Sequence, residues 1–224
     1  GKPIDYQNRF IAIGNYGSID DVFNYAQTAI NGTTASQVIP GDLIYIDFNG
    51  DGIINSNDKV VVDELNYPLT TIGFSFGFNW KGLNFSAMLY SPRNIYKLQF
   101  DQYLWDFPAS NIRVQPKSME RWTPETANSS GVMRPATHLN NTYNKVESTY
   151  RYSDYSYIRL KNMEIGYTFP KKWLSEAHIS NLQVYMNGNN LLTFWKGDKR
   201  VDPETGGVGS YPIVRTYTLG LRVS

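Results

Sequence analysis

The residues whose spacing most clearly suggests chemistry lie in one short loop, 47–58. Oxygen-bearing side chains occupy loop positions one, three, five, nine and twelve, with glycine at position six and isoleucine at position eight. This is the order found in EF-hand calcium loops, where about six to eight oxygens surround the cation around a tight turn. The loop predicts bound calcium, with the carbonyl of Ile53 and five side chains as ligands. The predicted metal ligands are Asp47, Asn49, Asp51, Ile53, Asn55 and Asp58.

Position twelve departs from the usual pattern, because Asp58 stands where a longer, bidentate glutamate is typical. The shorter side chain predicts weak affinity. The alternative is a solvated turn without metal, in which the Asp and Asn side chains bind neighbouring backbone N–H groups. The sequence leaves both interpretations open.

Aromatic side chains in the long segment 91–153 are the candidates for ligand contact. Aromatic rings offer flat apolar surfaces on which a ligand can stack. Tyr103, Trp105 and Trp122 are the predicted substrate contacts. For Trp122, which lies in Arg121-Trp122-Thr123-Pro124-Glu125, an equally good interpretation is that its burial anchors the loop.

Catalysis finds no support in the sequence, and we predict that the chain is not an enzyme. His138 and His178 have no serine or paired carboxylate at a recognisable spacing. The glycine-rich stretch 205–209 lacks the Lys-Ser/Thr of a phosphate loop.

Composition excludes several classes of protein. The 224 residues carry 21 Lys+Arg and 20 Asp+Glu, and a net charge of +1 provides no basic field for nucleic acid. The absence of Cys excludes disulfide frameworks and thiol nucleophiles. No window approaches the roughly 18 consecutive apolar residues of a membrane helix.

The many aromatic residues alternate with small or polar ones along several segments, which predicts strands. In 71–80, Ile72, Phe74, Phe76, Phe78 and Trp80 alternate with Thr, Gly, Ser and Asn. Lys81-Gly82 then predicts a tight hairpin to 83–90. Further strands are predicted at 154–169, 182–195 and 216–223. Large apolar residues opposite small neutral ones favour a membrane barrel, with lipid on one side, over a water-soluble sandwich.

The connections alternate in length, as in outer-membrane barrels, where periplasmic turns are short and extracellular loops long. Lys81-Gly82 and 170–181 are short, whereas 91–153 and 196–211 are longer. A further strand around Tyr6–Tyr16 brings the predicted total to six. Aromatic residues at strand ends, namely Trp80, Tyr90, Trp195 and Tyr211, are predicted to form interfacial girdles. An open sheet of six strands would leave unpaired N–H and C=O groups at both edges, which a bilayer does not tolerate. The strands that pair with these edges are therefore expected on a preceding segment or on another chain.

Several motifs occur in a characteristic order. They are Pro40 to Asp47 with the loop that follows, Arg121 to Glu125, Tyr157 to Asn162, Ile165 to Pro170, Asn187 to Leu192, Asp202-Pro203-Glu204, Tyr211-Pro212 and Tyr217 to Leu221. In this order the chain resembles the C-terminal part of the SusC/RagA family of TonB-dependent outer-membrane transporters.

The resemblance implies an all-β fold: the C-terminal portion, about six antiparallel strands, of a large transmembrane β-barrel with long extracellular loops. It divides 1–224 into an extracellular loop 31–68 that holds the calcium loop, a long extracellular loop 91–153, and three last strands in 154–224. Neither a plug domain nor a TonB-contacting box is recognisable, and a terminal aromatic residue is expected to follow Ser224.

The implied function is import of oligosaccharides or peptides across the outer membrane. The implied partners are the remainder of the barrel, the lipid bilayer, a SusD-like surface lipoprotein, and the TonB complex acting through the plug. Two alternatives remain. A soluble, calcium-stabilised β-rich adhesion module would bury the apolar face of 71–80 without detergent. A small complete barrel acting as an enzyme or pore would need about eight strands.

Overall fold

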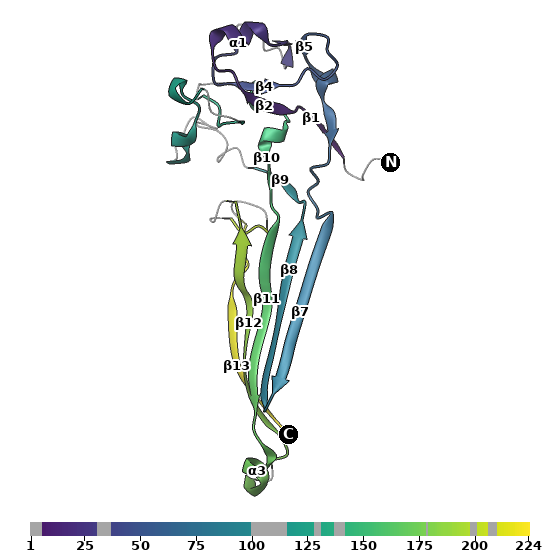
Figure 1. The fold of residues 1–224 in the computed structure, drawn as a ribbon, viewed down its shortest axis with the longest axis vertical. Coiled ribbons are helices and arrows are strands. Elements are labelled where there is room, and N and C mark those ends of the chain that lie inside the picture. Colours follow the sequence, from purple (N-terminus) through teal and green to yellow (C-terminus); the bar gives the residue numbers. More distant parts are fainter. Residues whose placement is uncertain are drawn as a thin grey trace. The chain divides into compact units, whose positions relative to one another are not determined.

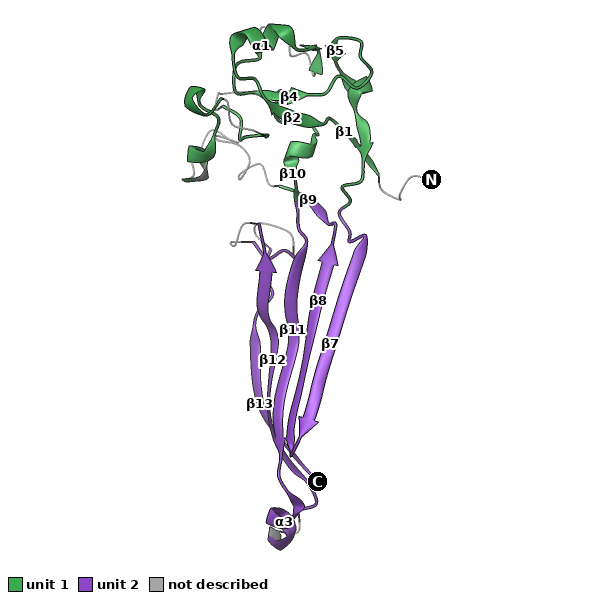
Figure 2. Cartoon of the chain, in the orientation of Figure 1, with its two compact units in different colours: residues 1–65, 98–153 green, residues 66–97, 154–224 purple. Residues whose placement is uncertain are grey.

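A computed structural model describes residues 6–30, 37–99, 116–127, 131–136, 142–177, 179–197, 201–205 and 210–224. The chain forms two compact units (Figure 2). Unit 1 comprises Gly1–Leu65 and Leu98–Ser153, and unit 2 comprises Asn66–Lys97 and Asp154–Ser224. Two short strands, β9 (Tyr96–Leu98) and β10 (Tyr152–Asp154), lie at the boundaries between the units.

Unit 2 is built on one five-stranded sheet in the order β13-β12-β11-β8-β7, with all neighbours antiparallel (Figure 1). Its strands are β7 (Thr70–Trp80), β8 (Leu83–Arg93), β11 (Tyr157–Thr168), β12 (Leu182–Trp195) and β13 (Thr216–Val223). These are the five long strands predicted from alternation.

The register gives the sheet one apolar face. Phe78 lies opposite Phe85 and Phe74 opposite Leu89, while Ile165 lies opposite both Phe85 and Met186. Because side chains alternate between faces, the residues between these positions share the other face. That face is mainly polar or small and also carries a few large side chains, such as Met88, Tyr90 and Tyr185. The register shifts between Leu160 and Asn162, where an irregularity interrupts the ladder. On either side of this point the apolar residues of β11 stay on the same face of the sheet.

Both connections at one end of the sheet are short. Lys81 and Gly82 have φ of 48° and 89°, which is the positive-φ pair that a two-residue hairpin requires. An added Cβ on Gly82 would lie 2.5 Å from the carbonyl oxygen of Thr168, so the turn also needs glycine for space. The β11 to β12 connection contains the short helix α3 (Lys171–Leu174) and the 3₁₀ turn η7 (Ser175–Ala177).

Unit 1 consists of short, paired strands and single helical turns. β1 (Gln7–Arg9) pairs with β6 (Val60–Val62), β2 (Ala12–Asn15) with β4 (Leu43–Tyr45), and β3 (Gln27–Thr28) with β5 (Ile53–Ile54). Helix α1 (Ile19–Asn24) begins at Ser18 with a capping box to Asp21. The 3₁₀ turns are η3 (Ser56–Asp58), η4 (Pro116–Glu120), η5 (Pro124–Thr126) and η6 (Thr149–Arg151).

The predicted sixth strand around Tyr6–Tyr16 is wrong. The segment forms the two short strands β1 and β2, which pair within unit 1 rather than with the long sheet. Phe10 and Tyr16 are the reason: both are buried in the core of unit 1, together with Leu43, Tyr45 and Tyr143. Because these rings are buried in the core of unit 1, they cannot also lie on a face of the barrel wall.

The segments predicted as two separate loops, 31–68 and 91–153, belong for the most part to one compact unit. Their described residues up to Leu65 and from Leu98 onward join residues 6–30 in unit 1. That unit has its own core, to which Val38, Ile54 and Val146 contribute. Within the described ranges, no helix is both long and apolar enough to cross a membrane.

Candidate functional site

The candidate calcium loop lies in unit 1, between β4 and β6, and it contains β5 and η3. Gly50 and Gly52 have φ of 74° and 81°, a backbone conformation that residues other than glycine rarely adopt. These two residues turn the backbone sharply inside the loop.

Side-chain oxygens in the first half of the loop accept bonds from nearby backbone N–H groups. Asp47 accepts from Gly50 at 2.7 Å and from Gly52 at 2.8 Å. Asp51 accepts from Ile53 at 2.8 Å, and its own N–H donates to Asn49 at 2.9 Å. The carboxylates thus lie on the inside of the turn, where the donors converge.

Asp58 closes the second half of the loop. Its carboxylate is 1% exposed and accepts from Phe48 at 2.9 Å and Asn49 at 3.3 Å through Oδ1, and from Asn55 at 2.8 Å through Oδ2. Asn55 caps η3 by accepting from Asn57 at 2.9 Å. The departure from glutamate at position twelve therefore has a structural role, because the short side chain holds three N–H groups across the loop.

These side-chain to backbone bonds are the ones that the alternative interpretation predicts. A carboxylate or amide oxygen that accepts one N–H keeps a lone pair for a cation, so the donor set is compatible with calcium. Among the described residues, however, no group of three or more His, Cys, Asp or Glu side chains is placed to hold a metal. Calcium at Asp47, Asn49, Asp51, Ile53, Asn55 and Asp58 stays a prediction.

Trp122 is 8% exposed and packs within unit 1. An added Cβ on Gly41, which has φ of 94°, would lie 2.6 Å from the indole, so the ring lies directly on this glycine. The backbone N–H of Trp122 donates to the carbonyl of Arg134 at 2.7 Å. This geometry supports the anchoring role. Tyr103, Trp105, His138 and His178 lie outside the described residues.

The apolar face of the long sheet is open. Phe74 and Phe78 are 58% and 52% exposed, and Leu219 on the other edge strand is 78% exposed. The other large, exposed side chains of this face are Ile72, Phe76, Trp80, Ile165, Met186, Leu192, Phe194, Tyr217, Leu221 and Val223. A continuous patch of this kind on a folded chain marks a surface that is covered by another apolar phase or a partner.

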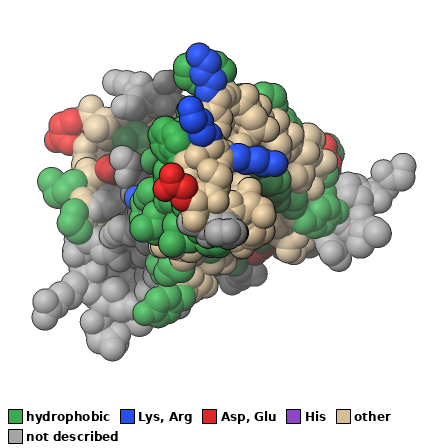
Figure 3. Space-filling view, turned by 90° about the horizontal axis from the view of Figure 1, so that it is seen from below, with side chains coloured by type: hydrophobic (Ala, Val, Ile, Leu, Met, Phe, Trp, Pro, Cys, Tyr) green, Lys and Arg blue, Asp and Glu red, His purple; other side chains and the backbone are tan. Residues whose placement is uncertain are grey.

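One end of this face carries aromatic and basic side chains together. Trp80 and Trp173 are exposed there, and Nζ of Lys81 lies 5.2 Å from the centre of the Trp80 ring. The view from this end shows Lys and Arg side chains beside hydrophobic ones (Figure 3). The girdle prediction is wrong for Tyr90 and Trp195, because their register places them on the polar face.

The polar face is cross-linked between strands. Arg222 on β13 donates to Gln183 at 3.0 Å and to Glu164 at 3.3 Å, so it joins three strands. Asn162 donates to Asn189 at 2.9 Å, and Asn189 donates to Thr216 at 3.2 Å. These bonds satisfy polar groups that line one side of the sheet.

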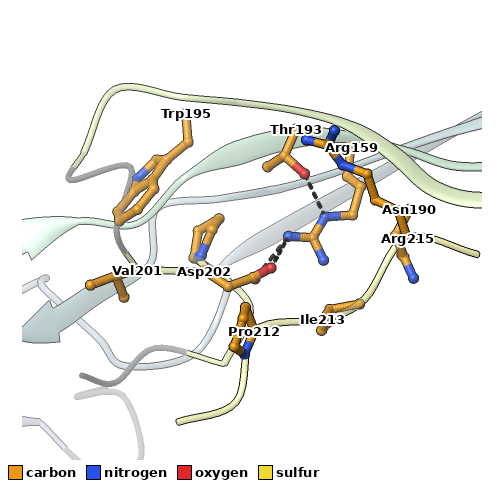
Figure 4. Close-up of a pocket in the computed structure, with 10 residues that line it drawn as sticks. Arg159, Asn190, Thr193, Trp195, Val201, Asp202, Pro212, Ile213 and Arg215 are labelled. Atoms are coloured by element: carbon orange, nitrogen blue, oxygen red, sulfur yellow. Dashed lines mark hydrogen bonds and ion pairs between the residues drawn. The ribbon is translucent and has the colours of Figure 1, made fainter. Parts of the chain in front are cut away.

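A buried ion cluster on the polar face was missed by the sequence interpretation (Figure 4). Arg159 is 1% exposed; its Nη2 donates to both oxygens of Asp202 at 2.8 Å, its Nη1 to Glu204 at 2.8 Å, and its Nε to Thr193 at 3.0 Å. Lys161 also donates to Glu204, at 2.7 Å. The cluster fastens the connection between β12 and β13 to the sheet. The signal in the sequence was the pair of carboxylates in Asp202-Pro203-Glu204, which follows β12, together with the cations Arg159 and Lys161 on the neighbouring strand β11.

No family model matches the chain, but its sequence is similar to those of curated TonB-dependent receptors. It is 32% identical over 217 residues to "TonB-dependent receptor P26" of Formosa agariphila, covering 87% of this chain and 20% of the relative. It is 28% identical over 198 residues to "TonB-dependent receptor P3" of the same species, covering 82% of this chain and 19% of the relative. "TonB-dependent receptor SusC" of Bacteroides thetaiotaomicron is 24% identical over 190 residues, covering 81% of this chain and 17% of the relative. The chain thus spans about a fifth of the length of the curated relatives it matches.

The fold is similar to that of solved transporter structures. A structure of the RagAB peptide transporter aligns with a TM-score of 0.67 and 20% identity, covering 97% of this chain and 22% of that one. A structure of the RagAB peptide importer in the "open-open" state aligns with a TM-score of 0.65 and 20% identity, covering 98% of this chain and 22% of that one.

Proposed function

We propose that this chain forms part of the wall of an outer-membrane barrel that imports nutrients. Its relatives and its fold support its assignment as a segment of a SusC/RagA-type TonB-dependent transporter. In this proposal the five long strands of unit 2 cross the membrane, and the rest of the barrel continues from the two edge strands, β7 and β13.

The observation that carries the proposal is the division of the sheet into two faces. Exposed aromatic and aliphatic side chains cover one face from β7 to β13. The other face carries mainly polar and small side chains, several of them cross-linked, together with a few larger rings such as Tyr90 and Tyr185. Lipid outside and a wet interior require this division in a barrel wall. Trp80, Trp173 and Lys81 fit the membrane interface, where aromatic rings and snorkelling lysines are enriched.

The edges of the sheet support the same proposal. Within the described residues, β7 and β13 each pair on one side only. Unpaired N–H and C=O groups cost several kcal/mol each in hydrocarbon, so a membrane sheet has to continue until it closes. Further strands of the same transporter would pair with both edges.

The partners and the substrate follow from the relatives by analogy. One relative carries the name SusC, and the solved neighbours are described as a RagAB peptide importer. We propose a SusD-like surface lipoprotein as the partner at the extracellular mouth, TonB as the source of energy through a plug, and oligosaccharides or peptides as cargo. Unit 1 would then lie at the extracellular side, with its loop 47–58 braced by calcium.

The test compares two adjacent substitutions in the full-length transporter, Phe76→Lys and Ser75→Lys. Lysine on the lipid face near the bilayer midplane costs about 2–4 kcal/mol, whereas on the interior face it meets water. We expect Phe76→Lys to lower strongly the amount of folded, heat-modifiable protein in the outer-membrane fraction. Ser75→Lys should assemble at close to the native level.

The rival function is a soluble adhesion or binding module. It predicts that the protein is released from cells without detergent and stays monomeric in plain buffer. That result, or equal assembly of the two lysine variants, would contradict the transporter proposal.

A further inference from the structure

A pocket of about 400 Å³ lies on the polar side of unit 2, next to the ends of β11 and β12 (Figure 4). Strand residues form one part of its lining, and the connection between β12 and β13 forms the rest. The residues that line it are Arg159, Asn190, Thr193, Trp195, Val201, Asp202, Pro203, Pro212, Ile213 and Arg215. Its volume is within the range typical of small-molecule sites.

One wall of the pocket is fixed by the ion cluster of Arg159. All three nitrogens of this guanidinium already donate, to Thr193, Glu204 and Asp202. Lys97 adds bonds from its Nζ to the carbonyls of Pro203 at 3.0 Å and Glu204 at 3.3 Å. Arg159 and Asp202 therefore hold the shape of the pocket, since each is bonded to the other and to neighbouring groups of the protein.

Arg215 is the cation of the lining that is left to bind a ligand. Its side chain is exposed, and it has no ion pair among the residues that the structure describes. Asn190, which has φ of 54°, donates from Nδ2 to the carbonyl of Val214 at 3.4 Å and so lies beside Arg215 in the fold. Figure 4 draws Asn190 and Arg215 at one end of the pocket and Trp195 and Val201 at the other.

The Trp195 end of the pocket is apolar and well packed. The Trp195 ring packs on Tyr155 with centroids 5.0 Å apart, and its Nε1 donates to the carbonyl of Asp154 at 3.4 Å. Val201 belongs to the same buried cluster. A ligand with an apolar or ring-shaped body would pack here, while its polar end reaches Arg215.

The charge around the pocket favours an anion. The described side chains that line it or bond to its wall include four cations, Lys97, Arg159, Lys161 and Arg215, against two carboxylates, Asp202 and Glu204, which leaves a net charge of +2. A planar guanidinium without a partner matches a carboxylate in geometry as well as in charge.

We propose that this pocket binds a carboxylate-bearing ligand, with Arg215 holding the carboxylate, Asn190 adding an amide contact and Trp195 packing against the body of the ligand. This inference rests on the proposed function in one respect: the polar face has to line the transport path for cargo to reach the pocket. The carboxylate can come from an acidic sugar or from the C-terminus of a peptide.

The test is titration calorimetry on the purified full-length transporter in detergent, with two matched pairs of probes. The sugar pair is digalacturonate and its methyl ester, and the peptide pair is N-acetyl-trialanine and its amide. We expect at least one charged probe to bind at least tenfold more tightly than its neutral partner. A preference within one pair alone identifies the source of the carboxylate.

Three variants make the test specific. Arg215→Gln should abolish the preference for the charged probe, and Arg215→Lys should keep part of it. Arg93→Gln should leave the preference intact, since Arg93 is an arginine of the same unit that lies outside the lining. Comparable binding of charged and neutral probes by the native protein, or a preference that survives Arg215→Gln, would overturn the proposal. Binding in detergent does not depend on which face meets lipid, so this failure is distinguishable from failure of the transporter proposal.

Discussion

Nη2 of Arg159 donates to both carboxylate oxygens of Asp202 at 2.8 Å, and the arginine side chain is only 1% exposed. This pair joins the middle of the sheet to the connection between β12 and β13, 43 residues further along the chain. A pair so deeply buried holds its geometry, because the loss of one partner leaves the other charge without water.

Arg159→Met should therefore destabilise the transporter by about 3–5 kcal/mol, because Asp202 and Glu204 lose a buried partner. Urea unfolding in detergent micelles measures this difference. The matched control is Arg222→Gln, whose side chain is 52% exposed and whose ion pair with Glu164 should contribute about 1 kcal/mol or less. Equal losses for the two variants would show that burial of Arg159 adds nothing.

Gly220 on β13 should tolerate no side chain. An added Cβ would lie 2.4 Å from the ring of Tyr185, its cross-strand partner, and this ring also lies under the guanidinium of Arg222. Gly220→Ala should cost about 1–3 kcal/mol by overpacking. Gly73→Ala is the control, because a Cβ there meets nothing within 4 Å. The same urea unfolding measures both variants.

A double-mutant cycle identifies the cause of that cost. If the clash with Tyr185 is responsible, Gly220→Ala combined with Tyr185→Ser should cost clearly less than the sum of the two single changes. Additive losses would assign the effect of Gly220→Ala to the backbone instead.

The long strands were predictable because their information is local. In 71–80 every second residue is large and apolar, and Lys81-Gly82 fixes the register to 83–90, so face and pairing follow from the sequence alone. The same reasoning failed at 6–16, where Gln7 pairs with Val62 and Ala12 with Tyr45. Strands of three or four residues carry too little periodicity to reveal partners so far along the chain.

The candidate sites divide in the same way. The loop 47–58 was visible because its turn is built from its own residues, such as Asp47, Gly50 and Gly52. Arg159 was not visible, because a single arginine on an alternating strand is indistinguishable from a solvated one until Asp202 and Glu204 are placed beside it.

Calcium should bind the loop 47–58 with a dissociation constant on the order of 10⁻⁴–10⁻³ M, as in extracellular modules. Asp51→Asn removes one negative charge from the loop while its amide oxygen still accepts from Ile53 N–H. The one turn bond that it loses is the bond from Nδ2 of Asn49, at 2.9 Å, between two exposed side chains. We expect calcium to raise the melting temperature of the native protein, and Asp51→Asn to weaken binding at least tenfold. The melting temperature of this variant in EDTA should stay close to that of the native protein in EDTA, because the lost bond joins exposed side chains.

The contrary outcome for the loop is also clear. Melting temperatures of the native protein that are equal in calcium and in EDTA would mean that the side-chain hydrogen bonds of the loop form the turn without metal.

The measurement that tests the central claim most directly is the local environment of two neighbouring residues of β7. These 224 residues contain no cysteine. In the full-length transporter, with any cysteine outside this segment replaced by serine, Ser75→Cys and Phe76→Cys each place a single nitroxide label on β7 in lipid vesicles. Oxygen concentrates in lipid, whereas a water-soluble nickel chelate stays outside it. The transporter account predicts that the label at position 76 collides mainly with oxygen and that the label at position 75 does not. Preferential access of the nickel chelate to position 76, or oxygen access confined to position 75, would contradict it.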